Sequence, residues 1–386
     1  MGVSPKTFKL LFFGKVPPPN TGMTVITKTI LDLMQESGKC EVKIISSSLG
    51  YLRSETFLGS LIYYVRQVLN IFRSISSLKK ELSHQEYHVI YFAASSTLLG
   101  NITDQIVSKI GKKRGLHVVA HLHNGNYQDN FSKFRLFGGG HKVVQFVDTF
   151  IFGSEGLYTP CKDYIPRDKM TIIPNPIDLN LRCSDQELTI KWKRQESNLP
   201  IRVFYLANFI EEKGYLVLKK AVEKIYHQGL EEKLQICFAG LWLSEQSKKD
   251  FLISIEQSVA RKCFIHIGPI TDRASVKKEL LSADILCLPS FYPVEAQPVS
   301  IIEAMNAGNA ILSTFHASIP EVVVNGEDGL LVEKRSEQAL AEGLQKMLDR
   351  SVVATMGQQA RAHFMEKFHH DILRKQLIET FYPLFK

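Results

Sequence analysis

Hydrophobic residues follow two alternating patterns along this chain. Short runs of β-branched and aromatic residues are separated by longer segments in which apolar residues recur every three or four positions. The short runs are typical of buried strands, and the longer segments of helices that pack on a sheet. Strands separated by helices of this length predict parallel sheets built from βαβ units. The predicted strands are Phe8–Gly14, Val42–Ser46, Val89–Ala93, His117–Leu122, Thr149–Gly153, Thr171–Pro174, Arg202–Ala207, Leu234–Ala239, Cys263–Ile267, Asp284–Leu288, Ala310–Ser313 and Gly329–Val332.

A polar segment at about residues 180–200 separates the two sets of strands, and an apolar run resumes at Ile201. We interpret this segment as a linker. The 386 residues also exceed the roughly 250–300 at which a single hydrophobic core stops growing. We therefore expect an α/β protein with two Rossmann-like, doubly wound parallel sheets, in residues 1–180 and 201–367. Their ligand-binding edges would face a cleft between the domains.

The segment Phe291–Gly308 predicts a helix that begins at a ligand site. Pro298 suits the first helical position, where its missing N–H would be unpaired anyway, and Gly308 suits the position just past the helix end. The helix is therefore expected from about Pro298 to Ala307. Its first turn offers unpaired N–H groups and roughly +0.5 of an elementary charge, which together favour phosphate.

Two carboxylates, Glu295 and Glu303, flank that helix start at a spacing of eight residues. A carboxylate does not attract phosphate, but it accepts two hydrogen bonds from the adjacent hydroxyls of a ribose or hexose. A sugar nucleotide would satisfy both features. The alternative is a chance pair on an ordinary helix that buries Val299, Ile302 and Met305.

Composition and charge narrow the class of partner. Hydrophobic residues make up 45% and charged residues 22% of the chain, as in ordinary globular proteins. The formal charge of +8 indicates an anionic partner, which could be a phosphorylated substrate, an acidic membrane or nucleic acid. Nucleic acid ranks last, because the sequence has no zinc-finger spacing and no aromatic RNA-binding signature.

The cysteines and apolar runs bear on the compartment. The six cysteines form no C-x-x-C pair, so we expect small buried side chains in a reducing compartment. No apolar run reaches the ~18 residues of a membrane span, and KLLFFG is too short for a signal-peptide core. A cytoplasmic location is expected, with the inner face of the membrane as the alternative.

The segment Leu58–Leu82 has apolar residues at helical spacing, namely Leu58, Leu61, Val65, Leu69, Phe72 and Leu82. Its basic residues are Arg66, Arg73, Lys79 and Lys80. We favour a core helix with a solvated basic face. The alternative is an amphipathic helix that lies on an anionic membrane.

Three motifs in the second half together resemble a known family. EAQPVSIIEAMNAG, the preceding ADILCLPS and the following IPEVVVNGEDGLLV occupy Ala283–Val332. They resemble the retaining GT-B glycosyltransferases of family 4, whose hallmark is an E-x7-E motif. The resemblance implies the GT-B fold and transfer of a hexose from a nucleotide-diphosphate sugar to a lipid-linked or polysaccharide acceptor.

Other motifs extend the resemblance over nearly the whole chain. VPPPNTGMTVIT resembles the loop after the first strand, AHLHNGNY a strand that ends in a histidine, and IIPNPID the element that closes the N-terminal domain, with Pro176 in place of a glycine. LANFIEEKGY resembles the first strand and loop of the C-terminal domain. Residues 368–386 resemble a tail that crosses back to the N-terminal domain.

The resemblance implies a role for each site residue. Catalytic roles fall to His123, which we prefer over His121, to Lys213 at the diphosphate and to Glu295 at the donor hexose. Glu303 would bind the ribose. Donor binding would further involve Gly22, Asn208, Ile270, Gln297, Pro298 and Val299. Many family members carry an arginine at the position of Asn208, so Lys213 would neutralise the diphosphate with only the helix terminus to help it.

The cofactor and the reaction class complete the sequence-based expectations. The chain has no D-x-D motif and no metal-ligand spacing, so transfer is expected to be independent of metal, with a UDP- or GDP-sugar as donor. Two alternatives stay open: a sugar-nucleotide epimerase or phosphorylase of the GT-B type, and a catalytically silent scaffold on a membrane. A dinucleotide dehydrogenase is disfavoured, because its G-x-G-x-x-G fingerprint is missing.

Overall fold

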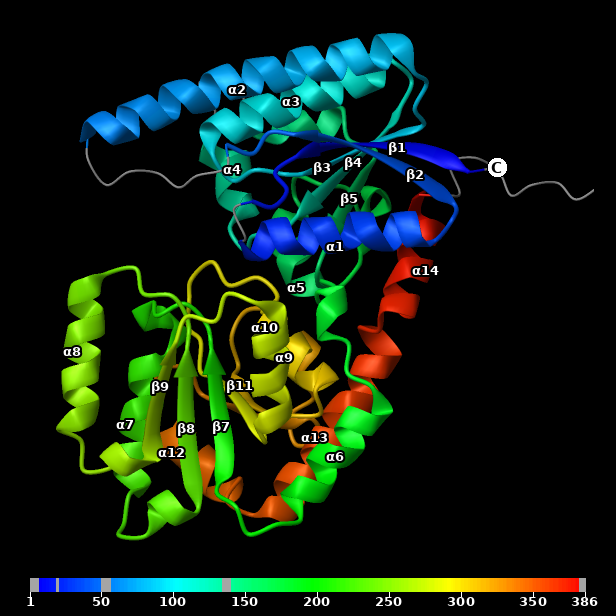
Figure 1. The fold of residues 1–386 in the computed structure, drawn as a ribbon. Helices are drawn as coiled ribbons and strands as arrows, with labels where there is room; N and C mark the ends of the chain where they lie inside the picture. Colours follow the sequence, from blue (N-terminus) through cyan, green and yellow to red (C-terminus); the bar gives the residue numbers. More distant parts are fainter. Residues whose placement is uncertain (1–6, 19–20, 50–56, 134–139, 382–386) are drawn as a thin grey trace, which may run out of the picture. The chain divides into compact units, whose positions relative to one another are not determined.

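The computed structural model describes residues 7–18, 21–49, 57–133 and 140–381. The chain divides into two compact units. Unit 1 comprises Met1–Pro176 together with His370–Lys386, and unit 2 comprises Ile177–His369. A parallel sheet of six strands forms the centre of each unit (Figure 1).

The sheet of unit 1 has the strand order β2-β1-β3-β4-β5-β6. Helix α1 covers one face of this sheet, and α2 and α3 cover the other (Figure 1). The C-terminal helix α14 contacts α1. The strands are β1 (Phe8–Gly14), β2 (Cys40–Ser46), β3 (Val89–Ala93), β4 (His117–Leu122), β5 (Thr149–Phe152) and β6 (Met170–Ile172), and the helices are α1 (Gly22–Glu36), α2 (Phe57–His84), α3 (Leu98–Lys113), α4 (Tyr127–Lys133), α5 (Glu155–Tyr158) and α14 (His370–Phe381).

The sheet of unit 2 has the order β12-β11-β10-β7-β8-β9. Helix α7 packs with α12, and α10 with α13. The strands are β7 (Ile201–Leu206), β8 (Leu234–Ala239), β9 (Phe264–Gly268), β10 (Ile285–Leu288), β11 (Ala310–Thr314) and β12 (Gly329–Val332), and the helices are α6 (Asp185–Gln195), α7 (Tyr215–Ile225), α8 (Glu245–Glu256), α9 (Arg273–Ser282), α10 (Val299–Asn306), α11 (Ile319–Val322), α12 (Glu337–Lys346) and α13 (Arg350–Lys367).

The predicted fold class is confirmed, because both sheets are parallel and interleaved with helices. Each of the twelve predicted strands is present with its ends within two residues of the expected positions. The six cysteines are all free and buried, as expected of small apolar side chains.

The segment expected to be a linker, residues 180–200, instead forms helix α6. Ser184 caps this helix, and the side chain of Glu187 reaches back to the Ser184 backbone N–H. Leu188 packs in the core of unit 2. The units divide at Pro176 and Ile177, so α6 belongs wholly to unit 2. The segment resembled a linker because most of the side chains on this helix are polar.

Helix α10 begins one residue later than predicted. Pro298 has an extended backbone (φ −65°, ψ 110°) and precedes the first helical residue, Val299. The C-terminal end agrees with the prediction, because Gly308 follows the cap residue Ala307 with a left-handed φ of 66°. This conformation favours glycine.

The apolar residues expected on one face of α2 lie on two different faces. Leu82 is buried, whereas Val65, Leu69 and Phe72 are exposed. The interpretation of all of them as a core face is therefore wrong for these three exposed residues. The side chains of Leu58 and Leu61 lie outside the described residues.

Candidate functional site

The order of strands in unit 2 identifies the edge at which a ligand would bind. Strand β7 pairs with β8 on one side and with β10 on the other. The chain therefore reverses its direction of winding between β7 and β10. In open α/β sheets, ligands bind beyond the carboxyl ends of the strands at such a switch point. The loops that follow β7 and β10 carry several of the residues singled out from the sequence.

Lys213 and Glu295 meet at this switch point. The Lys213 Nζ atom donates to Oε1 of Glu295 at 2.9 Å and to Oε2 at 2.7 Å. The Ser290 hydroxyl also donates to Oε2, at 2.6 Å. Only 7% of Glu295 is exposed, so the carboxylate is buried but has three hydrogen bonds. The lysine also lies 4.9 Å from the ring centroid of Tyr292, within the range of a cation–π interaction.

The two loops approach each other closely through their main chains. The Phe291 N–H donates to the carbonyl of Glu212 at 2.7 Å. Gly214 has a φ of 85°, and a Cβ at this position would lie 2.2 Å from the carbonyl oxygen of Pro289. A side chain at residue 214 would therefore push the loops apart. The glycine beside Lys213 allows the lysine to reach Glu295.

The start of α10 leaves backbone donors available. Pro298 provides no side-chain cap for this helix, whereas Asp272 caps the neighbouring helix α9 by accepting from the Ser275 N–H. Pro298 and Gln297 are buried beside this terminus, and Val299 packs against the core. An uncapped helix N-terminus can donate hydrogen bonds to an anion and carries a partial positive charge.

Glu303 lies in the second turn of α10, and 5% of it is exposed. Arg273 donates to its Oε1 atom, and the Arg273 Nε atom lies 3.2 Å from Oδ2 of Asp178. Burial raises the pKa of Glu303, the charge and hydrogen bond of Arg273 lower it, and the charge of Asp178 raises it again. The arginine thus favours an ionised carboxylate at a buried position.

Arg273 and Ser290 were not predicted as site residues from the sequence. Ser290 comes two residues after strand β10, where polar side chains of parallel sheets often reach a ligand. Arg273 is the first residue of α9, a position at which a positive charge opposes the helix dipole. This local conflict could have marked the arginine as a residue with a partner elsewhere.

Two further residues of unit 2 that were predicted to bind the donor are Asn208 and Ile270. Asn208 is exposed, and its carbonyl accepts from the Ile210 N–H at 2.8 Å. Ile270 is half-buried and packs against the hydrophobic core. Asn208 lies in the loop after β7, and Ile270 lies in the loop after β9. Among the described interactions, neither residue contacts Lys213 or Glu295.

In unit 1, the two candidate histidines lie at the end of β4. Their rings are stacked, with centroids 4.0 Å apart. His121 is fully buried, and its Nδ1 atom lies 2.8 Å from the hydroxyl of Tyr91. Burial lowers the pKa of His123 to about 4, against the opposing effect of the Asn175 side chain. His123 is therefore neutral at pH 7, and His121, whose pKa is also lowered by burial, is neutral too.

Gly22 is the first residue of α1, which follows strand β1. Thr21 caps this helix by accepting from the Thr24 N–H. A Cβ at Gly22 would meet no atom within 4 Å. Packing inside the chain therefore does not demand glycine here, and the space beside it is open.

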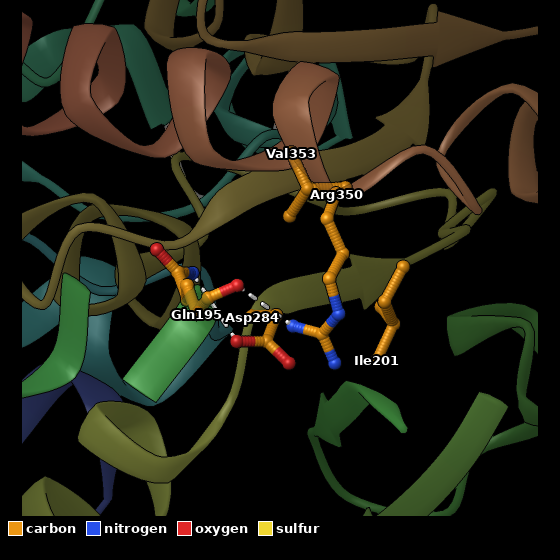
Figure 2. Close-up of a pocket in the computed structure, with 5 residues that line it drawn as sticks. All are labelled: Gln195, Ile201, Asp284, Arg350 and Val353. Atoms are coloured by element: carbon orange, nitrogen blue, oxygen red, sulfur yellow. Dashed lines mark hydrogen bonds between the residues drawn. The ribbon is translucent and has the colours of Figure 1, made fainter. Parts of the chain in front are cut away.

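A small hollow lies at the opposite end of strands β7 and β10, away from Lys213 and Glu295. It is lined by Gln195, Ile201, Asp284, Arg350 and Val353 (Figure 2). Asp284 accepts from Gln195 at 3.2 Å, as drawn in Figure 2. Ile201 begins β7 and Asp284 directly precedes β10, so this hollow lies at the amino ends of the strands. Ligand chemistry in such sheets belongs at the carboxyl ends.

Metal binding and membrane crossing each require a particular arrangement of side chains. In the part of the chain that the structure describes, no group of three or more His, Cys, Asp or Glu side chains is placed to hold a metal ion. Within the same residues, no helix combines the length and the hydrophobicity that crossing a bilayer requires.

Comparison with known families and proteins gives a consistent result. Residues 186–363 match the family model described as glycosyl transferases group 1. A protein of Salmonella typhimurium, WcaL, named for a glycosyltransferase role in colanic acid biosynthesis, is 29% identical over 185 residues. The amylovoran biosynthesis glycosyltransferase AmsK of Erwinia amylovora is 29% identical over 191 residues. These matches cover 46% and 48% of this chain, and 44% and 46% of the relatives. The matched region thus spans less than half the length of either relative.

A solved structure matches nearly the whole chain. The structure of HepE from Anabaena in complex with UDP-glucose aligns with a TM-score of 0.70. The alignment covers 97% of this chain and 100% of HepE at 17% sequence identity. Together with the two parallel six-stranded sheets, this similarity shows that the chain has the GT-B fold.

Proposed function

Because residues 186–363 match the family model of glycosyl transferases group 1, we propose that this chain is a retaining hexosyltransferase. It would move a hexose from a nucleotide-diphosphate sugar to a lipid-linked or polysaccharide acceptor in the synthesis of a surface glycan. The observation that carries the proposal is the cluster of Lys213, Glu295 and Glu303 around the uncapped start of α10, at the switch point of the unit 2 sheet. The group contains one cation, one helix terminus and two buried carboxylates.

These groups match the parts of a sugar nucleotide. Glu303, whose ionised form the charge of Arg273 favours against the effect of burial, would accept hydrogen bonds from the two ribose hydroxyls. The N–H groups at the start of α10 would bind the diphosphate. Lys213 has three N–H donors, of which the two oxygens of Glu295 take two. The third remains for a phosphate oxygen, where the ammonium would neutralise charge that develops as the nucleoside diphosphate leaves.

The contacts of Glu295 favour a same-face mechanism for retention. Double displacement would require a carboxylate nucleophile with a second carboxyl group ~5 Å away. Both oxygens of Glu295 instead accept hydrogen bonds, from Lys213 and Ser290. We assign this carboxylate to the hydroxyls of the donor hexose, together with the backbone at Gln297. The leaving phosphate would then help to deprotonate the acceptor.

Two residues of unit 1 complete the proposal. His123 is neutral at pH 7 and would act as a hydrogen-bonding group at the donor sugar, since a ring with a pKa of about 4 is a weak base. Gly22 would allow close approach to the donor phosphates or the acceptor, in keeping with the open space beside it. We propose smaller contributions to donor binding from Asn208, near the diphosphate, and from Ile270, near the base.

The relatives support the choice of donor and acceptor class. HepE was crystallised with UDP-glucose, which favours a UDP-sugar among nucleotide donors. WcaL and AmsK are named for colanic acid and amylovoran biosynthesis, which favours a polysaccharide as the product. We propose transfer that is independent of metal, because Lys213 and the helix terminus already supply positive charge at the diphosphate. The reaction would take place on the cytoplasmic side of the membrane.

A binding experiment tests the donor site directly. Thermal unfolding of the full chain is measured with UDP, GDP and their sugars, each with and without EDTA. A ligand at about 100 times its Kd should stabilise the chain by ~2.7 kcal/mol. If none of the nucleotides stabilises the chain, the proposal is overturned and a catalytically silent scaffold is favoured. Stabilisation that EDTA abolishes would overturn metal independence.

A second experiment separates the two glutamates and the reaction classes. Glu303→Ala should weaken UDP and UDP-sugar alike, whereas Glu295→Ala should weaken chiefly the UDP-sugar. Equal losses for both variants would contradict this division of roles. Release of UDP that requires an added acceptor glycan would support a transferase. Conversion of the donor without any acceptor would instead indicate an epimerase.

A further inference from the structure

Helix α2 of unit 1 is anchored to the sheet by one apolar face. Ile75, Leu78 and Leu82 are buried in the core of this unit, at spacings of three and four residues. Ser74 adds a hydrogen bond to the Ser46 carbonyl at the end of β2. These contacts account for the inner side of the helix and fix which side faces outward.

A second apolar row lies on the outward side. Ile62, Val65, Leu69 and Phe72 are 44%, 52%, 51% and 67% exposed. Their spacing of three, four and three residues places them in one line along the helix. With about 100° between successive residues, this row lies roughly 130° around the helix from the buried face. The core of unit 1 therefore gives no reason for four large apolar side chains in this row.

Basic residues border the apolar row. Arg66, Arg73 and Lys80 are exposed and seven residues apart, so they form a second line beside the first. Lys79 is exposed on the opposite border. Residues 62–80 contain no aspartate or glutamate. The outer side of α2 is thus apolar along its middle and positively charged along its borders.

We propose that this surface, which we call the outer row (Ile62, Val65, Leu69 and Phe72 with Arg66, Arg73 and Lys80), docks unit 1 on an anionic lipid bilayer. The apolar side chains enter the boundary between headgroups and acyl chains, and the cations meet lipid phosphates. The helix lies in the plane of the bilayer surface and does not cross it. The interaction is independent of donor binding in unit 2.

Charge complementarity favours a membrane over a second copy of the chain. A symmetric dimer through α2 would place the same surface of each copy against the other. The basic borders of the two copies would then come together, and residues 62–80 contain no acidic residue that could offset this repulsion. An anionic bilayer satisfies both features of the surface, because it offers an apolar interior beneath a layer of negative charge.

Vesicle co-sedimentation of the full chain tests the proposal. The vesicles contain phosphatidylcholine alone or phosphatidylcholine with one third phosphatidylglycerol. The wild type should bind the anionic vesicles, and added salt should weaken the binding. The double variant Leu69→Glu/Phe72→Glu and the triple variant Arg66→Gln/Arg73→Gln/Lys80→Gln should each reduce the partition coefficient by about tenfold or more.

Matched controls come from exposed positions of unit 2. Ile190→Glu changes a side chain that is 70% exposed, and Lys346→Gln removes an exposed charge on α12. Both should bind vesicles like the wild type, and unchanged thermal unfolding would show that every variant is folded. Failure of the wild type to bind anionic vesicles, or equal binding by the Leu69→Glu/Phe72→Glu variant, would overturn the proposal. A dimer in sedimentation velocity that this variant dissociates would identify a second copy as the occupant instead.

Discussion

Lys213 donates to both carboxylate oxygens of Glu295, although the two residues are 82 positions apart in the chain. The lysine follows β7 and the glutamate follows β10, which are neighbours in the sheet. The ion pair therefore links the two loops at the switch point of unit 2. With side chains that are 17% and 6% exposed, it is shielded from solvent and from screening by salt.

Replacement of Lys213 by methionine should lower kcat by about 10²- to 10³-fold, since it removes the positive charge expected at the leaving diphosphate. Initial rates of UDP release measure the effect. Lys219→Met is the matched control, because it breaks an ion pair with Glu223 on α7. Lys213→Arg should retain part of the activity. Rates for the folded Lys213→Met protein within threefold of the wild type would contradict the assigned role.

Replacement of Arg273 by glutamine should shift the pH dependence of UDP binding to higher pH. Arg273 lowers the pKa of Glu303, which burial raises, so its removal raises that pKa further. The ionised carboxylate is the form proposed to bind the ribose, and affinity is therefore expected to increase as pH rises through the pKa. Titration calorimetry with UDP at a series of pH values measures the midpoint. Arg202→Gln breaks an ion pair with Glu279 at the other end of β7 and should leave the midpoint unchanged.

Most of the strands could be predicted because they are short runs of buried apolar residues. The run Ile285–Leu288, for example, is buried at every position. Helix α6 was missed for the opposite reason. Its burial depends on Leu188 and on Lys191, a residue type that is seldom buried. Periodicity alone could not separate this helix from a polar linker.

The contacts between the site residues were harder to predict than the strands, because they depend on tertiary structure. The spacing of Glu295 and Glu303 marked both carboxylates, but the order of strands in the sheet decides that Lys213 reaches Glu295. The position of Arg273 at the start of α9 suggested a partner elsewhere, but only the structure identifies that partner as Glu303, on helix α10. On α2, the apolar positions could be identified from periodicity, whereas only packing distinguishes the buried Leu82 from the exposed Phe72.

Lys191 should make the stability of the chain rise with pH. Only 2% of it is exposed, and its Nζ atom donates to the Ala307 carbonyl at 2.7 Å and to the side chain of Asn309. Burial lowers its pKa from 10.5 to about 7, against the opposing charge of Asp284. Between these two pKa values, the unfolded chain binds a proton that the native chain lacks. Stability therefore increases with pH in this window.

The Lys191→Met variant isolates this effect. One proton corresponds to a slope of at most about 1.4 kcal/mol per pH unit. Denaturant unfolding from about pH 7 to 8.5, below the ordinary pKa of the thiols, should show a steeper rise for the wild type than for the variant. Lys346→Met, at an exposed position of α12, should keep the slope of the wild type. Parallel slopes for the wild type and Lys191→Met would contradict the lowered pKa.

We expect His121 to stabilise the fold of unit 1 and His123 to act in the reaction. His121→Ala leaves the buried Tyr91 hydroxyl without its partner and should cost ~1–3 kcal/mol of stability. Tyr91→Phe is the control, since it removes both the hydroxyl and its need for a partner. His123→Ala should instead lower kcat by about 10- to 100-fold, because it removes the neutral hydrogen-bonding group expected at the donor sugar.

The pH profile distinguishes this role of His123 from general acid or base catalysis. Since the pKa of His123 is lowered to about 4, its ring becomes protonated only near that pH. The rate of the wild type should therefore show no change that depends on His123 between about pH 6 and 8. Rates of wild type and His123→Ala across this range should run parallel. A limb near pH 6.5 that disappears in His123→Ala, or loss of activity in His121→Ala alone, would reverse the assignment.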